Sequence, residues 1–219
     1  MGYVIAIDGP AGAGKSTIAR AVAEKLAFVY IDTGAMYRTI ALWAVQSGTP
    51  VSDAHKLEQL ALAAEIELLP HRRVRLNGED VSDAIRAPEI SALASQVAAI
   101  GPVRAVMVAK QRQLAQHENV VMEGRDIGSV VFPDARVKIF LDADPSERVR
   151  RRAGELPDEH HRTLAAELTE RDERDRNRAE SPLLQAPDAV YLDSTGMTPE
   201  DVEGAILRIV RAKISNGKA

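Results

Sequence analysis

The eight residues at positions 9–16 constrain the fold more than any other stretch of this chain. They read Gly-Pro-Ala-Gly-Ala-Gly-Lys-Ser and match the pattern of a glycine, four residues and Gly-Lys-Ser/Thr, which is typical of loops that bind phosphate. Such a loop turns its backbone N–H groups inward around a polyphosphate, and large side chains would block that approach. In this pattern Lys15 reaches the phosphates and the hydroxyl of Ser16 holds Mg²⁺.

The residues on both sides of the loop support this interpretation. Residues 3–7 are a short apolar run that predicts a buried parallel strand, and residues 17–26 place Ile18, Val22 and Leu26 on one face of a helix. A strand, a loop and a helix in this order hold an anion at the helix N-terminus, where free N–H groups and the helix dipole favour negative charge. The alternative, a glycine-rich turn without a ligand, does not account for the lysine together with both flanks.

Composition narrows the class of protein. The chain has 219 residues, which is enough for one domain with insertions, and its hydrophobic content of 45% supports a packed core. The absence of cysteine from the sequence excludes disulfides and thiolate metal sites. A net charge of −4 is a poor electrostatic basis for nucleic-acid binding, whereas the clustered arginines suit small anionic ligands.

The sequence also carries expectations about location. No apolar run approaches the length of a membrane span, and the N-terminus lacks a basic start and carries Asp8 within its apolar stretch, which argues against a signal peptide. We therefore expect a cytoplasmic monomer without a nucleic-acid or membrane partner.

Strands and helices alternate along most of the chain, which predicts an α/β fold with a doubly wound, parallel, five-stranded sheet. Ligands bind such sheets at the carboxyl ends of the strands, so the loops after the first three strands should meet in one cleft. The predicted strands are residues 3–7, 28–31, 119–123, 137–141 and 189–192. The predicted helices are residues 17–26, a segment ending at 46, 56–65, 88–99, 102–117, 145–153, 164–178 and a last helix that Thr198 caps.

Two segments interrupt this alternation. Residues 66–69, 73–76 and 79–81 are short strand-like runs with an Asn-Gly turn signal after the second, and they indicate an inserted subdomain. Residues 154–161 are polar and end in two adjacent histidines. Adjacent histidines share neither a helical nor a strand face, and no acidic or cysteine partner has ligand spacing, so we do not expect a metal there.

The most charged stretch is residues 171–178, Arg-Asp-Glu-Arg-Asp-Arg-Asn-Arg. A run of this kind is usually a solvated helix with internal ion pairs, such as an i,i+4 pair between Asp172 and Arg176. Three arginines on one helical face nevertheless exceed what Asp175 can neutralise, and arginine forks suit phosphate oxygens. This face would carry Arg171, Arg174, Asp175 and Arg178.

Two further groups are candidates for binding chemistry. Arg125 and Asp126 follow an apolar strand and form either a strand-end ion pair or part of an anion site. Thr33, Tyr37 and Arg38 follow the second strand, where the alternative is ordinary helix-start chemistry. The neighbouring side chains that we expect to lie in the core are Met36, Tyr37, Trp43 and Met107.

Five stretches of the sequence, in order and spread over nearly the whole chain, together resemble the cytidylate kinases of bacteria. They are residues 9–17, 32–38, 95–97, 123–126 and 171–178. Three of these stretches are the most specific for the resemblance: Asp-Thr-Gly-Ala-Met-Tyr-Arg, Glu-Gly-Arg-Asp-Ile-Gly and Arg-Asp-Glu-Arg-Asp-Arg-Asn-Arg. It implies the fold of the nucleoside monophosphate kinases, with a phosphate-binding core, a monophosphate-binding insert at residues 33–100 and a lid at residues 150–165.

The resemblance also implies roles for individual residues. The ATP phosphates would lie at Gly9, Pro10, Ala11, Gly12, Ala13, Gly14, Lys15, Ser16 and Thr17, with Mg²⁺ at Ser16. Phosphate oxygens would be held by Arg38, Arg125 and Arg178, the base read by Ser95, Arg104 and Asp126, and the sugar contacted by Arg171 and Asp175, with Thr33 also in the acceptor site. The catalytic set would be Lys15, Arg125 and Arg178, and strand order puts the adenine near residues 193–195.

The implied reaction is ATP-dependent phosphorylation of CMP and dCMP to CDP and dCDP with Mg²⁺. The acceptor phosphate is largely dianionic at pH 7 and is already a nucleophile, so no catalytic base is needed. One alternative is a kinase of the same fold with another acceptor, such as UMP or shikimate. A second is a nucleotide-gated interaction protein, which would need a guanine-reading Asn-Lys-x-Asp stretch that the sequence lacks.

Overall fold

The structure is a computed structural model that describes residues 2–154 and 161–215. The chain divides into two compact units. The first unit is made of Met1–Ile31 and Ala115–Ala219, and the second unit is Asp32–Leu114. The positions of the two units relative to each other are not determined.

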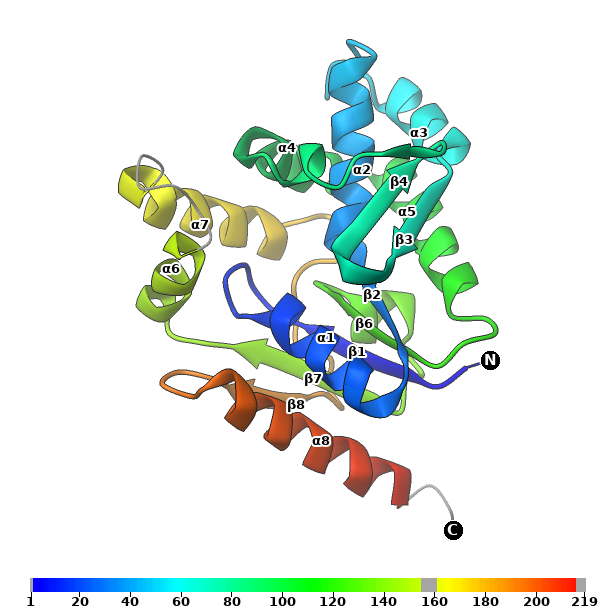
Figure 1. The fold of residues 1–219 in the computed structure, drawn as a ribbon. Coiled ribbons are helices and arrows are strands. Elements are labelled where there is room, and N and C mark those ends of the chain that lie inside the picture. The colour runs from blue at the N-terminus through cyan, green and yellow to red at the C-terminus, as the bar shows by residue number, and fades with distance from the viewer. Residues whose placement is uncertain (1, 155–160, 216–219) are drawn as a thin grey trace. The chain divides into compact units, whose positions relative to one another are not determined.

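A parallel five-stranded sheet forms the centre of the first unit, as the sequence predicted (Figure 1). Strand β1 lies between β6 and β7, and its residues Ile7 and Asp8 are aligned with Glu123 and Gly124 of β6. This register places the ends of β1 and β6, and the loops that follow them, next to each other. In spatial order the strands are β2 (Val29–Asp32), β6 (Val120–Gly124), β1 (Val4–Asp8), β7 (Val137–Asp142) and β8 (Val190–Asp193).

Helices α1 (Lys15–Leu26) and α8 (Pro199–Ser215) pack on one face of this sheet (Figure 1). Alternate strand residues such as Ile5 and Ile7 meet Ile18 of α1 and Ile206 of α8 in one buried cluster. Burial of these side chains is the main stabilising contribution, at about 1.5–3 kcal/mol for each. The other helical elements are η3 (Ile127–Val131), α6 (Pro145–Ala153) and α7 (His161–Arg176).

The second unit is built around helix α2 (Thr33–Gln46). Its helix contacts include α4 (Pro88–Val97), η2 (Ala84–Arg86), α5 (Gly101–Leu114) and α3 (Ala54–Ala63), and α3 in turn packs on α5. A small antiparallel sheet is formed by β3 (Ile66–Leu69), β4 (Arg73–Leu76) and β5 (Glu79–Asp80), with η1 (Pro70–Arg72) between the first two.

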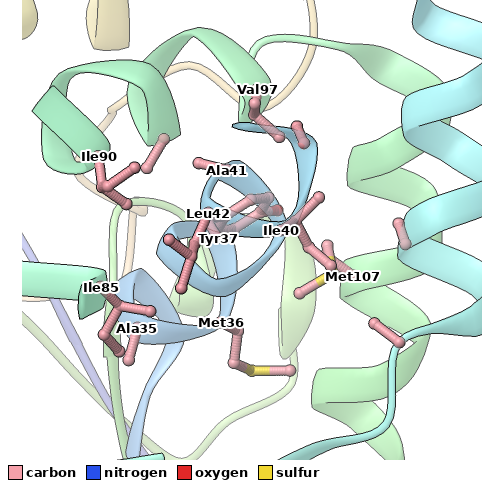
Figure 2. Packing of buried hydrophobic residues seen from close by; sticks show 14 of the residues in the cluster. Ala35, Met36, Tyr37, Ile40, Ala41, Leu42, Ile85, Ile90, Val97 and Met107 are labelled. Carbon is pink, nitrogen blue, oxygen red and sulfur yellow. The ribbon is translucent and has the colours of Figure 1, made fainter. Parts of the chain in front are cut away.

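Apolar side chains of α2 form the core of the second unit. Figure 2 shows Met36 and Ile40 of α2 among Val97 of α4 and Met107 of α5, and these side chains are almost completely buried. The predicted core positions are therefore confirmed for Met36 and Met107. Tyr37, which is 8% exposed, also belongs to this buried cluster as predicted, and Trp43 is partly buried against it.

Most predicted helices and strands are present, but several begin or end at other residues than predicted. Helix α3 begins two residues early because Asp53 accepts a hydrogen bond from the N–H of Lys56 at 3.1 Å. Thr198 caps α8 as predicted, accepting from the N–H of Asp201 at 3.2 Å. Helix α5 ends at Leu114 rather than residue 117, and α7 ends at Arg176 rather than residue 178.

Several expectations stay predictions. Residues 155–160 of the expected lid at 150–165 lie outside the described residues, and so do His160 and the side chain of His161. The monophosphate-binding role expected for residues 33–100 likewise remains a prediction. Among the described residues, no single helix is long and apolar enough to cross a membrane; α4 and α5 reach that length together, but they are bent by 100° to each other.

Candidate functional site

The loop at residues 9–16 passes close to neighbouring backbone on its outer side. Gly9 has φ +150°, and a Cβ atom at this position would lie 1.9 Å from the carbonyl oxygen of Leu141 in β7. Gly12 has φ +77°, and a Cβ there would lie 2.7 Å from the carbonyl oxygen of Arg148 in α6. Only glycine fits either position. The loop is therefore held against β7 and α6 while Lys15 opens α1.

Lys15 is buried, and its Nζ donates a hydrogen bond to the carbonyl oxygen of Pro10 at 2.7 Å. Burial, with repulsion from Arg125 as the next cause, lowers the pKa of Lys15 to about 7. The ammonium therefore lies in a position where a nearby anion would stabilise its charge. Ser16 and Thr17, in the first turn of α1, are exposed.

Asp8, the last residue of β1, fixes the loop after β6. Its carboxylate accepts hydrogen bonds from the N–H groups of Ile127 at 2.8 Å and Gly128 at 2.7 Å. Burial raises the pKa of Asp8 to about 6, against the effect of these two hydrogen bonds, and the neighbouring Asp126 adds to the rise. Asp126 itself is 5% exposed and is held at the start of η3.

A cluster of arginines surrounds the carboxylate of Asp175. Arg125 Nε donates to Asp175 Oδ2 at 2.9 Å, and Arg178 Nη2 bonds to the other carboxylate oxygen. Burial alone would raise the pKa of Asp175, but Arg125, Arg178 and Arg171 together hold it below its ordinary value. Three guanidinium groups thus act on one buried carboxylate, which is 1% exposed.

The charged helix α7 corrects two details of the sequence interpretation. Asp172 does not form the expected i,i+4 pair with Arg176: Asp172 is buried and pairs with Arg148 of α6, whereas Arg176 is exposed. Arg178 lies beyond the end of α7, yet it reaches Asp175. The reason is that one face of α7 packs on α6, so the burial of Asp172 selects a partner on that helix.

Six of the predicted site residues in the first unit are linked by charge–charge interactions, either directly or through a shared partner. Arg125 and Arg171 both lower the pKa of Lys15, and Asp8 links Lys15 to the loop of Asp126. The residues brought together are Lys15, Arg125, Asp126, Arg171, Asp175 and Arg178.

The second unit holds four further candidates in its own framework. Asp32 caps α2 through the N–H of Ala35 at 2.8 Å and also binds Arg38 at 2.9 Å. Arg104 of α5 is 3% exposed; its Nη1 donates to the carbonyl oxygen of Ala98 at 2.9 Å, and its guanidinium lies 5.8 Å from the centre of the Tyr37 ring. Thr33 at the start of α2 and Ser95 in α4 are also buried.

Some residues around this site were not identified from the sequence. In the sequence Asp8 is a charge at the end of an apolar strand, and a buried carboxylate ahead of a phosphate-binding loop is itself a signal that it has partners. Tyr30 of β2 donates to Glu123 of β6 at 2.5 Å, a contact between strands that no local pattern indicates. The buried pair of Arg148 and Asp172 joins two helices, and no local pattern indicates it either.

The described residues contain no group of three or more histidine, cysteine, aspartate or glutamate side chains that could hold a metal ion.

Comparison with known proteins gives consistent matches. The family model described as Cytidylate kinase matches residues 5–212. A cytidylate kinase from Solibacter usitatus is 59% identical over 98% of this chain and 95% of its own length, and one from Geobacter sulfurreducens is 47% identical over 97% and 94%. A bifunctional pantoate ligase/cytidylate kinase from Synechococcus is 45% identical over 97% of this chain, which spans 45% of that longer protein.

Two solved structures share the fold at low sequence identity. A structure of an uncharacterized protein from Eubacterium ventriosum has a TM-score of 0.56 at 11% identity, covering 97% of this chain and 99% of that one. A gluconokinase from Sinorhizobium meliloti has a TM-score of 0.50 at 15% identity, covering 98% and 94%. These likenesses concern the α/β fold alone.

Proposed function

The chain belongs to the cytidylate kinase family, and on that premise we propose that it transfers the γ-phosphoryl group of ATP to CMP and dCMP, giving CDP or dCDP and ADP. The observation that carries this proposal is the neighbourhood of Lys15, Arg125, Arg171 and Arg178 in the first unit. Two nucleotides with opposed phosphates need positive charge at the point where those phosphates meet, and these four side chains supply it.

On the donor side, the glycine positions leave room for the ATP phosphates. Gly9 and Gly12 approach the backbone of β7 and α6 closely, and the N–H groups that follow Ala11 in the loop would turn toward the anion. Lys15 would leave the carbonyl of Pro10 for the β- and γ-phosphates. The exposed hydroxyl of Ser16, one residue further, fits a Mg²⁺ ligand, and Mg²⁺ bound with ATP would neutralise charge between those phosphates.

On the acceptor side, Arg125 and Arg178 would hold the phosphate of CMP. Both are oriented by Asp175, so little rotamer freedom is lost when a phosphate binds. The acceptor oxygen is already nucleophilic as a dianion, and the work of the site is to align two anions against their repulsion. Arg38 of the second unit is proposed to bind the same phosphate, and Arg171 with Asp175 the sugar.

Asp126 is proposed to read the base, with Ser95 and Arg104 of the second unit and with Thr33 in the same acceptor site. The exocyclic amino group of cytosine donates a hydrogen bond that a carboxylate accepts, whereas uracil presents an oxygen that a carboxylate repels. A site built on such a bond discriminates by several orders of magnitude, because the wrong base leaves a buried polar group unpaired.

An acceptor screen tests the function directly. Purified protein with ATP and Mg²⁺ is offered CMP, dCMP, UMP and shikimate, and ADP release is coupled to NADH oxidation while CDP is identified by chromatography. We expect CMP and dCMP to give the highest kcat/KM. A higher value for UMP or shikimate would reassign the acceptor, and nucleotide binding without transfer to any acceptor would favour the interaction-protein alternative.

We also propose that the protein acts as a monomer in the cytoplasm, on free nucleotides and not on nucleic acid. The net charge of −4 supports the last point, since nucleic-acid affinity depends on neutralising many phosphates. Light scattering at the assay concentration tests the oligomeric state.

A further inference from the structure

Both backbone polar groups of Ala11, in the phosphate-binding loop, are bound by side chains of α6 and α7. The N–H of Ala11 donates to Asp172 Oδ1 at 3.3 Å, and its carbonyl oxygen accepts from Arg148 Nη1 at 3.1 Å. The same two side chains pair directly through Arg148 Nη1 and Asp172 Oδ2. Asp172 is 3% exposed and Arg148 is 6% exposed, so these contacts are shielded from water.

This arrangement follows from what such a loop requires. When N–H groups turn inward toward phosphate, carbonyl oxygens turn outward and need donors from the protein. Arg148 supplies a donor for Ala11, and Arg151, one turn further along α6, donates to the carbonyl oxygen of Ala13 at 3.2 Å. The N–H of Ala11 is directed to Asp172, so the contact to phosphate falls to the N–H groups that follow it.

The contacts at Ala11 also reach Lys15 through one peptide plane. The peptide unit between Pro10 and Ala11 accepts from Lys15 Nζ on its oxygen and donates to Asp172 on its nitrogen. Because a peptide unit is planar and rigid, the hydrogen bond to Asp172 helps set the orientation of the oxygen on which the ammonium rests. Arg148 holds the next peptide unit, so two consecutive planes are fixed from outside the loop.

We propose that Arg148 and Asp172 are positioning residues for phosphoryl transfer, which hold the phosphate-binding loop and the resting position of Lys15 by binding both polar groups of Ala11. Neither side chain touches a reacting atom. The proposal rests on the proposed function only for the identity of the donor, ATP, and it predicts a defect confined to the donor side.

A purely structural ion pair would behave differently, and this difference can be measured. Replacing a buried ion pair by apolar residues of similar volume is often neutral or stabilising. The double variant Arg148→Met with Asp172→Leu should therefore be more stable than a variant that removes only one partner of the pair. It cannot supply partners for the Ala11 N–H and carbonyl, so a positioning role predicts that the nucleotide defect remains.

The experiment measures the Kd for MgATP by calorimetry, kcat, and the KM values for ATP and CMP, beside thermal unfolding. For Asp172→Leu and for the double variant we expect the Kd and KM for ATP to rise about tenfold and kcat to fall, with the KM for CMP within about twofold of wild type. Asp142, whose Oδ1 is 3.6 Å from Arg148 Nε, remains to balance the arginine in the single variant.

Asp188→Asn is the matched control, because it removes one carboxylate of an ion pair, that with Lys138 at 2.8 Å, and no loop contact. It should lower stability without changing the Kd for MgATP. If the other variants do not fold, Arg148→Lys replaces them in the test. It keeps the positive charge beside Asp172 but lacks the second guanidinium donor that reaches the carbonyl oxygen of Ala11, so it should also weaken MgATP binding. A folded double variant, or a folded Arg148→Lys, with wild-type affinity for MgATP would overturn the proposal. Failure of the proposed function would appear instead as wild-type protein that binds MgATP but makes no CDP.

Discussion

Lys15 of the first unit and the candidate arginines of the second unit are held in opposite ways. In the first unit, Lys15 carries a charge that is buried at a cost, because burial lowers its pKa to about 7. In the second unit, Arg38 rests on the capping carboxylate of Asp32, and Arg104 rests on a backbone carbonyl and the ring of Tyr37.

The difference has a consequence for stability. When the charged form of a side chain is disfavoured in the free folded protein, a bound ligand is what stabilises that charge. Removal of such a side chain should stabilise the fold while abolishing function. A side chain supported by a cap, a carbonyl or a ring is part of the packing, and its removal should destabilise the fold while weakening function less. The predictions below test this contrast, from the largest expected effect to the smallest.

Lys15→Met should have the largest effect. Loss of the cation at the phosphates should lower kcat by a factor on the order of 10³. Because the buried ammonium is disfavoured in the free protein, the variant should be more stable by about 1–2 kcal/mol, measured by urea unfolding. Lys25→Met, at an exposed position in the last turn of the same helix, is the control and should leave kcat unchanged. A Lys15→Met protein that is inactive and also less stable would contradict the contrast between the units.

Asp126→Ala should have the next largest effect, on the choice of base. We expect kcat/KM for CMP to fall by about 10²-fold or more, and the ratio of CMP to UMP activity to shrink, because the acceptor for the cytosine amino group is lost. Steady-state kinetics with both nucleotides measure this. An unchanged ratio would show that Asp126 does not recognise the base, and its burial would then be explained by its place at the start of η3.

The pKa of Lys15 predicts opposite effects of pH on binding and on stability. The phosphates of ATP favour the ammonium form and raise the pKa, so ATP binding takes up a proton and its affinity should fall above pH 7, by up to about tenfold per pH unit. An unfolded lysine, with its ordinary value of 10.5, binds more protons than folded Lys15 between pH 7 and 10.5, so the contribution of Lys15 to stability rises with pH in this window.

Calorimetry of ATP binding in buffers of different ionisation enthalpy measures the proton uptake. Urea unfolding between pH 7 and 9 measures the stability. Both pH dependences should be absent from Lys15→Met. Proton release on ATP binding would show that another group dominates the linkage.

The parts of this molecule that could be predicted from the sequence are those with local causes. The sheet strands are apolar runs between helices, and the loop at residues 9–16 needs its glycines for a local close approach. The contacts that orient the site join distant positions: Asp8 and the N–H of Ile127 are 119 residues apart. For Asp172, the local i,i+4 rule indicated Arg176, but burial against α6 selected Arg148. Helix periodicity identifies the face of a residue and not the helix that covers that face.

Tyr37→Leu should have the smallest effect on activity, and it tests the second unit. The ring lies under the guanidinium of Arg104, and loss of a cation–π contact of about 0.5–2 kcal/mol should raise the KM for CMP by about three- to tenfold. Since Tyr37 is also part of the core around α2, the free energy of unfolding should fall by about 1–2 kcal/mol. Tyr37→Phe keeps the ring and removes the hydroxyl, so it should retain most of the affinity for CMP. Equal increases in the KM for CMP in both variants would show that the hydroxyl, and not the ring, is responsible. A Tyr37→Leu protein more stable than wild type would show that Tyr37, like Lys15, lowers the stability of the free protein.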